Sequence, residues 1–172
     1  MTCVMKISDI SPAGIDLIKR WESSRLYAYL DGAGIWTIGW GTTVYPSGTR
    51  VKQYDKCTQE QADEWLRLDL RWRVKKVDEL TVDTLDQKEF DALCCFTYNV
   101  GVNGLRSSTL RRLVNTDIEN PEIRAAFMAW HKNRDEETHE LVPSFGLWRR
   151  RHSEADMFYG VATNMPLYPY PR

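Results

Sequence analysis

The chain has 172 residues, which is enough for one domain or two small lobes with a hydrophobic core. Hydrophobic residues make up 42% and charged residues 27%, a balance that is typical of globular proteins and excludes a largely disordered chain. The 23 basic and 24 acidic residues leave a net charge of −1, which argues against a dedicated nucleic-acid-binding protein.

The chain lacks the sequence marks of export or membrane anchoring. Charged residues interrupt its first twenty positions, and no later stretch approaches the roughly 20 apolar residues that a membrane span needs. We therefore expect a protein made in the cytoplasm without a membrane anchor. Reduced thiols and no metal site are expected, because no Cys-x-x-Cys or Cys/His metal spacing occurs among Cys3, Cys57, Cys94 and Cys95.

The first third of the chain predicts a helix followed by a small antiparallel sheet. Ser11 suits a helix N-cap and Pro12 the first helical position, and apolar spacing extends this helix to about residue 23. Strand-forming residues then alternate with the turn sequences DGAG and PSG. About three short strands are expected between residues 24 and 57, too few to be stable without helices against them.

The remainder of the chain predicts helices. Thr58 and Gln61 have capping-box spacing, and a long helix is expected from about 59 to 81. The next helix, DQKEFDALCCFTYNVG, is expected to end at Gly101 as a C-cap. Shorter helices are expected at SSTLRRLVN, PEIRAAFMAWHKN and LWRRRHSEADMFYG, with a polar loop, DEETHELVPSFG, before the last one.

This order of elements predicts an α+β protein with one domain over residues 1–172. The sheet lobe covers about 24–57, the helical part about 11–23 and 58–160, and a Pro-rich tail 161–172. We expect a cleft between a sheet lobe and a mainly helical lobe, and polar groups facing such a cleft are the default site hypothesis.

Three polar residues near the start of the predicted sheet form a candidate catalytic set. Glycosidic cleavage needs one carboxylic acid to protonate the leaving oxygen and a second carboxylate to activate water or attack the sugar. Glu22 follows Trp21 at the rim of an aromatic region, where partial desolvation favours the protonated acid. Asp31 lies on a more solvated turn, and Thr37 offers a hydroxyl that could orient water. Asp-Gly turns are common, so this pattern alone favours an ordinary hairpin over a catalytic site.

Three segments in the same order resemble the phage lysozyme family, glycoside hydrolase family 24. The pattern WE-x8-D-x5-T places Asp31 nine residues after Glu22 and Thr37 six residues after Asp31, followed by IGWGTT. The segment FDALCCFTYNVGVNGLRSSTLRRLVN resembles part of the family's helical lobe, and FGLWRRRHSEADMF resembles its final helix. The resemblance spans about residues 15 to 158 and implies a lysozyme-like fold.

The resemblance also implies a role for each matching residue. Glu22 falls on the general acid, Asp31 on the carboxylate that acts with water, and Thr37 on the water-positioning hydroxyl. Arg150 falls on an arginine that supports the acid. Five further residues fall where the family lines the sugar cleft: Thr43, Tyr98, Asn99, Gly101 and Thr109. Each has a structural alternative: a strand position for Thr43, core packing for Tyr98, helix termination for Asn99 and Gly101, and a first-turn helix position for Thr109.

The implied activity is that of an endolysin that hydrolyses peptidoglycan between N-acetylmuramic acid and N-acetylglucosamine, with inversion and without a cofactor. Its implied partners are glycan strands, with release from the host cytoplasm to the periplasmic wall through a separate holin. We expect a monomer. Two alternatives remain open: a lytic transglycosylase, which Asp31 and Thr37 disfavour, and a non-catalytic murein-binding protein on a lysozyme scaffold.

Overall fold

The structure is a computed structural model and describes residues 6–135 and 137–162. The predicted tail therefore lies almost wholly outside the described residues, as does Cys3. Residues 16–73 form one compact unit, here called the sheet unit. The described residues up to 15 and from 74 onward form the second, here called the helical unit. No helix in the described part of the chain combines the length and apolar character that a membrane span requires.

The sheet unit begins within the first helix, α1 (Pro12–Trp21). Its last turn closes with a hydrogen bond from the Glu22 N–H to the Ile18 carbonyl (3.1 Å), so α1 ends slightly before the predicted residue 23. Ser11 caps its first turn as predicted: its carbonyl accepts from the Ile15 N–H at 3.1 Å and its hydroxyl from the Gly14 N–H at 3.4 Å.

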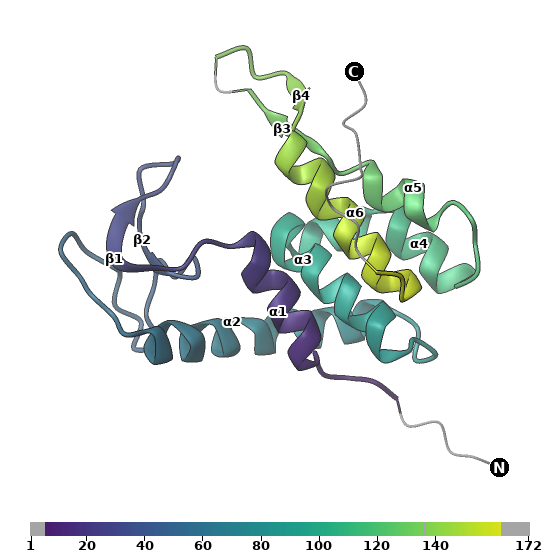
Figure 1. Ribbon diagram of the computed structural model, residues 1–172, viewed down its shortest axis with the longest axis horizontal. Helices are drawn as coiled ribbons and strands as arrows, with labels where there is room; N and C mark the ends of the chain where they lie inside the picture. Colours follow the sequence, from purple (N-terminus) through teal and green to yellow (C-terminus); the bar gives the residue numbers. More distant parts are fainter. Residues whose placement is uncertain (1–5, 136, 163–172) are drawn as a thin grey trace. The chain divides into compact units, whose positions relative to one another are not determined.

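A two-stranded antiparallel hairpin follows, formed by β1 (Arg25–Leu30) and β2 (Trp36–Gly39), which lie side by side in Figure 1. Tyr29 pairs with Thr37 and Leu30 with Trp36. The third strand predicted for this region is reduced to isolated bridges, which include Tyr27 with Lys56 and Val44 with Arg50. The glycine and proline turns between residues 39 and 54 interrupt the ladder too often for a continuous third strand.

The hairpin packs closely on the first turns of α2 (Gln59–Leu80). A Cβ on Gly39, which has φ +62°, would lie 3.0 Å from the Ala62 Cβ, so a side chain at this position would be strained and crowded. The Trp40 indole N–H donates to Asp63 at 2.7 Å, and Lys19 forms an ion pair with the same carboxylate at 2.8 Å. The predicted capping box is confirmed, with reciprocal hydrogen bonds between Thr58 and Gln61 at 2.9 and 3.2 Å.

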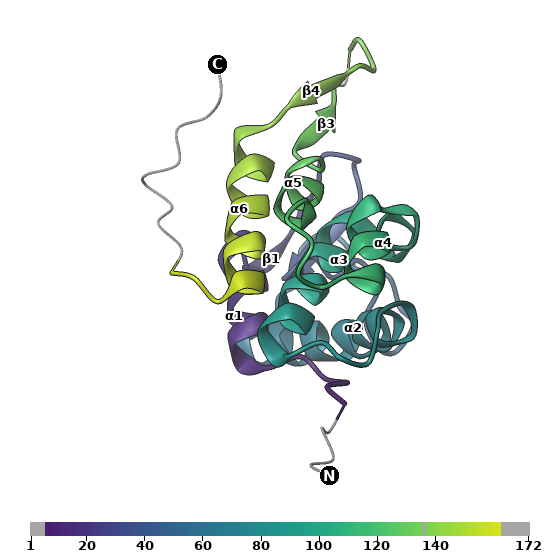
Figure 2. The ribbon, with the colours of Figure 1, turned by 90° about the vertical axis from the view of Figure 1, so that its right-hand side faces the viewer.

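The helical unit contains the second part of α2 and four further helices, which Figures 1 and 2 show in two views turned by 90°. These are α3 (Gln87–Ser107), α4 (Thr109–Thr116), α5 (Ile123–Met128) and α6 (Phe145–Tyr159). In both views α6 lies along α3 and α5. Three fully buried rings join these helices: Phe127 meets Phe96 and Phe158 at centroid distances of 5.6 and 5.7 Å.

A hairpin in the helical unit corrects the sequence-based predictions. The segment predicted as a loop contains β4 (Leu141–Pro143), and its partner β3 (Lys132–Arg134) lies at the end of the segment predicted as a helix, because α5 ends at Met128. This hairpin projects beyond α5 and α6 in Figure 2. All six strand residues are exposed, so the segment lacks the apolar alternation from which strands are recognised. The Asp135 carboxylate holds the tip by accepting hydrogen bonds from Thr138 and Glu137.

Gly101 interrupts α3, as the sequence predicts. It has φ +80° and ψ 163°, a conformation open almost only to glycine, and two helical segments meet at the kink that it forms. The second segment, in which Val102 and Leu105 are buried, was not predicted.

We expect the substitution Gly101→Ala to lower the free energy of unfolding by about 1–3 kcal/mol, because a Cβ is strained at this φ and ψ. Gly32→Ala is the matched control: Gly32 has open space around it and its φ lies outside the region that disfavours side chains. Urea unfolding of both variants measures the difference. Equal midpoints for the two variants would contradict the assigned kink.

The described cysteines are free thiols. Cys94 and Cys95 are buried on α3, and burial raises the pKa of both thiols well above the ordinary value. Cys57 is half-buried in the sheet unit. Cys94 and Cys95 therefore contribute to core packing, and their buried thiols have low reactivity in the folded protein.

Candidate active site

Four of the predicted site residues lie in the sheet unit: Glu22, Asp31, Thr37 and Thr43. The other five lie in the helical unit: Tyr98, Asn99, Gly101, Thr109 and Arg150. The two groups are described in turn.

Asp31 is held by the turn that joins β1 to β2. Its Oδ1 accepts hydrogen bonds from the main-chain N–H groups of Ala33 and Ile35, both at 2.9 Å. Among the residues that the structure describes, none donates to Oδ2, so one carboxylate oxygen is fixed while the second keeps its acceptor capacity. The turn therefore orients the carboxylate as well as reversing the chain.

Thr37 is held by the main chain of Ile35, the residue that also holds Asp31. Its hydroxyl donates to the Ile35 carbonyl at 3.0 Å, and the side chain is only 3% exposed. A hydroxyl that donates one hydrogen bond retains lone pairs that can accept from a water molecule. Ile35 thus links the two groups: its N–H holds the Asp31 carboxylate and its carbonyl holds the Thr37 hydroxyl.

Glu22 is the first residue after α1, and its amide completes the last helical turn. The side chain is half-buried, three residues before β1 begins. The end of a helix thereby fixes the backbone of Glu22, whereas the hairpin turn fixes the carboxylate of Asp31. Thr43 is half-buried, and its carbonyl accepts from the Val51 N–H at 3.0 Å in the loop after β2.

The helical unit places the remaining candidates around the kink of α3 and the start of α4. Tyr98 is half-buried and Asn99 is exposed on the last turn before the Gly101 kink. Thr109 is exposed as the first residue of α4, directly after the N-cap Ser108. The interpretation of Thr109 as a first-turn helix residue is confirmed, and Gly101 interrupts the helix as predicted.

Arg150 belongs to a buried ionic cluster on α6. Its Nε donates to Glu154 Oε1 at 3.2 Å, and Arg151 donates to the same oxygen at 2.8 Å. Arg151 also donates to Asn99 at 3.0 Å and lies over the Phe96 ring at 5.0 Å. Burial raises the pKa of the Glu154 carboxyl, an effect that the two guanidiniums oppose. One carboxylate thus fixes two arginines in the core.

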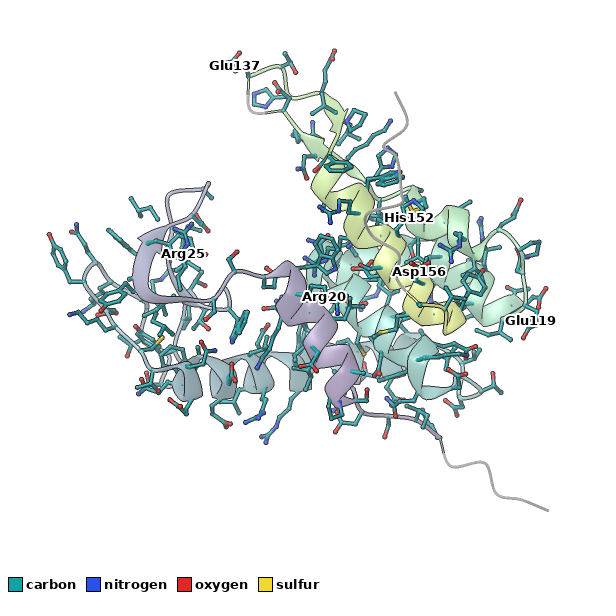
Figure 3. The ribbon with its side chains drawn as sticks, in the orientation of Figure 1. Arg20, Arg25, Glu119, Glu137, His152 and Asp156 are labelled. Carbon is teal, nitrogen blue, oxygen red and sulfur yellow. The ribbon has the colours of Figure 1, made fainter. Side chains whose placement is uncertain are left out.

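The side chains of the next turn of α6 are visible in Figure 3, where His152 and Asp156 are labelled on this helix. Asp156 is fully buried and pairs with Arg124 of α5 at 3.0 Å. The Asp156–Arg124 ion pair therefore joins α6 to α5, and the hydrogen bond from Arg151 to Asn99 joins α6 to α3. Together they fix the backbone that carries Arg150.

Comparison with known proteins identifies the family of this chain. A sequence profile of the phage lysozyme family matches residues 19–154. The chain belongs to the phage lysozyme family. It is 36% identical over 147 residues to the endolysin of Salmonella phage P22, which covers 85% of this chain and 95% of that protein. It is 34% identical to the endolysin of Acyrthosiphon pisum secondary endosymbiont phage 1, over 87% and 97% of the two chains.

Solved structures agree with the lysozyme-like fold of this phage lysozyme. The endolysin of the Escherichia coli O157:H7 phage FAHEc1 aligns with a TM-score of 0.81 at 35% identity, over 94% of this chain and 97% of that chain. The muramidase domain of SpmX from Asticaccaulis excentricus aligns with a TM-score of 0.77 at 32% identity, over 95% and 100%. The α+β prediction is confirmed, and family membership supports a lysozyme-type peptidoglycan hydrolase.

Arg151, which is bonded to Glu154 and Asn99, was not predicted to be buried in this lysozyme. Arg151 stands in a run of three arginines that reads as a solvated patch, yet it is fully buried. Its partners are Glu154, three positions on, and Asn99, 52 positions away. The spacing of Arg151 and Glu154 along a helix is a local signal for an ion pair, but nothing local shows that the pair is buried.

Proposed function

We propose that this phage lysozyme is an endolysin that hydrolyses the β-1,4 bond between N-acetylmuramic acid and N-acetylglucosamine in bacterial peptidoglycan. The observation that carries the proposal is that the main chain of Ile35 anchors both Asp31, through its N–H, and Thr37, through its carbonyl. A carboxylate and a hydroxyl held by the main chain of one residue are suited to fix a water molecule. A transglycosylase, which uses no water, has no need of such a pair.

The proposed reaction is a single displacement. Glu22 gives its proton to the glycosidic oxygen as the bond from that oxygen to C1 of the sugar breaks. A water molecule, oriented by the Thr37 hydroxyl, adds to C1 from the opposite face, and Asp31 takes its proton. The product sugar then has the inverted configuration, and no cofactor takes part. Arg150 remains the proposed support of the acid, and Thr43, Tyr98, Asn99, Gly101 and Thr109 the proposed sugar-contacting residues.

The proposed biological role is host lysis. The enzyme would accumulate as a monomer in the host cytoplasm and reach the periplasmic wall through a holin. The family membership and the named endolysin relatives support this role.

We expect digestion of purified sacculi in heavy-oxygen water to give reducing muropeptides that carry one heavy oxygen, because water becomes part of the product. Mass spectrometry of the fragments is the measurement, with Glu22→Gln as the inactive control. Anhydro ends without heavy oxygen would instead identify a lytic transglycosylase. Sacculi that bind the protein but stay intact would identify a murein-binding scaffold.

A further inference from the structure

The sheet unit carries a hollow that the proposed reaction does not use. Its volume is about 240 Å³. Three aromatic side chains and a polar rim line it, including Tyr27, Trp36, Gln53, Tyr54, Asp55 and Lys56. None of these residues is among those assigned to the cleavage site.

Tyr54 stands in this hollow in a conformation that its own side chain disfavours. It has φ +71°, at the third position of a turn closed by the Asp55 N–H on the Lys52 carbonyl at 3.2 Å. Glycine and asparagine usually occupy such positions because a larger side chain is strained there. The ring is 82% exposed, so little burial compensates the strain. Strain of this kind that persists without a gain in stability points to a functional role.

The turn that presents Tyr54 is held by Asp55. One oxygen of this carboxylate accepts from the Lys52 N–H and from the Tyr45 hydroxyl, both at 2.8 Å. These two hydrogen bonds hold the pKa of Asp55 below its usual value. Burial, together with the Asp55 carboxylate, raises the pKa of Tyr45 to about 12, so the phenol remains a donor at neutral pH. Tyr45 in turn packs on Trp65 at 4.9 Å, which ties the turn to α2.

The lining favours a ligand with an apolar face and polar edges. Aromatic rings supply flat apolar faces, and Lys56, whose ammonium lies 5.2 Å from the Tyr27 ring centre, supplies a donor at the rim. A pyranose ring has this character, since its C–H groups form an apolar face and its hydroxyl and amide groups lie at the edge. The volume falls below the roughly 300 Å³ at which drug-sized sites begin, which fits one ring better than a chain of them.

We propose that this hollow binds a single N-acetylhexosamine ring of peptidoglycan, with Tyr54 and Trp36 as the stacking surfaces. The choice of ligand rests on the proposed function. Trp36 and Thr37 are neighbours on β2, so their side chains leave the strand on opposite faces. The bound sugar therefore belongs to a glycan segment other than the one being cleaved, and the hollow holds the enzyme on the wall between cleavages.

Nuclear magnetic resonance of the isotope-labelled full chain, titrated with the methyl β-glycoside of N-acetylglucosamine, tests the site. We expect saturable shifts at the Trp36 indole and at the amides of residues 53–56. Tyr54→Asn removes the ring but suits the positive φ, so it should lose these shifts while its thermal midpoint stays at or above that of the parent. Trp72→Gln, on α2, is the matched control, because Trp72 is an exposed aromatic side chain outside the hollow.

A second measurement uses intact sacculi and the Glu22→Gln background, which binds without digesting. There Tyr54→Asn should weaken binding by about three- to tenfold, the range expected for one lost stacking contact. Unmoved amides, an equal loss in Trp72→Gln, a lowered midpoint in Tyr54→Asn, or shifts caused by a stem peptide and not by the sugar would each overturn the proposal. If the sugar titrates as expected but the parent leaves sacculi uncut, the hydrolase proposal fails while the hexosamine site is supported.

Discussion

Replacing Glu22 by Gln is expected to lower the rate of peptidoglycan hydrolysis by at least about 100-fold, because an amide cannot protonate the leaving oxygen and general acid catalysis is typically worth that much or more. The side chains have nearly the same size, and the backbone of residue 22 is held by the hydrogen bond from its N–H to the Ile18 carbonyl. The fold should therefore persist. Clearing of permeabilised Gram-negative cells measures the rate.

The matched control for this loss is Glu64→Gln. Glu64 lies on α2 in the same unit, with a side chain that is 54% exposed, and has no proposed role in the reaction. Circular dichroism melts of both variants should match that of the parent. If Glu22→Gln clears cells at the rate of the parent or of Glu64→Gln, Glu22 is not the acid.

Removing Glu154 is expected to cause the largest loss of stability. Glu154→Ala leaves the buried guanidiniums of Arg150 and Arg151 without the carboxylate that both contact, and breaking a buried ion pair costs about 3–5 kcal/mol. The cavity adds to this cost. Urea unfolding followed by tryptophan fluorescence measures it.

Two further variants keep this prediction testable. Glu79→Ala removes one partner of the exposed pair with Lys76 and should leave the unfolding midpoint nearly unchanged, because water already solvates both groups. Glu154→Gln keeps the volume and one acceptor oxygen, so it should fold with an intermediate loss even if Glu154→Ala does not fold. A midpoint for Glu154→Gln equal to that of Glu79→Ala would show that the cluster contributes little.

The helix boundaries were largely readable from local sequence. The reciprocal cap of Thr58 and Gln61 is where the sequence predicts it, and the last helix ends at Gly160, as predicted, with a left-handed C-cap of φ +64°. Such signals work because a cap satisfies main-chain groups within three or four residues of itself. The set Glu22, Asp31 and Thr37 was predicted differently, from the family resemblance of three separate segments.

The predictions failed where contacts distant in the sequence outweigh local preference. The break at Gly101 was predicted, but the helical segment that follows it, in which Val102 and Leu105 are buried, was not. All six strand residues of the β3–β4 hairpin are exposed, so its main-chain ladder and the Asp135 carboxylate hold it without a buried apolar face.

By itself, the sequence of this phage lysozyme determined its fold class, its family and the spacing of its candidate catalytic groups. The fold class depends on hydrophobic periodicity, and the family and the candidate groups depend on the resemblance of three separate segments. Only the tertiary structure decided that Ile35 anchors both Asp31 and Thr37, that Arg151 is buried, and that an exposed Tyr54 stands strained beside a hollow. Each of these depends on burial, hydrogen-bond direction or backbone dihedral angles, which the folded chain sets and which residue types alone leave open.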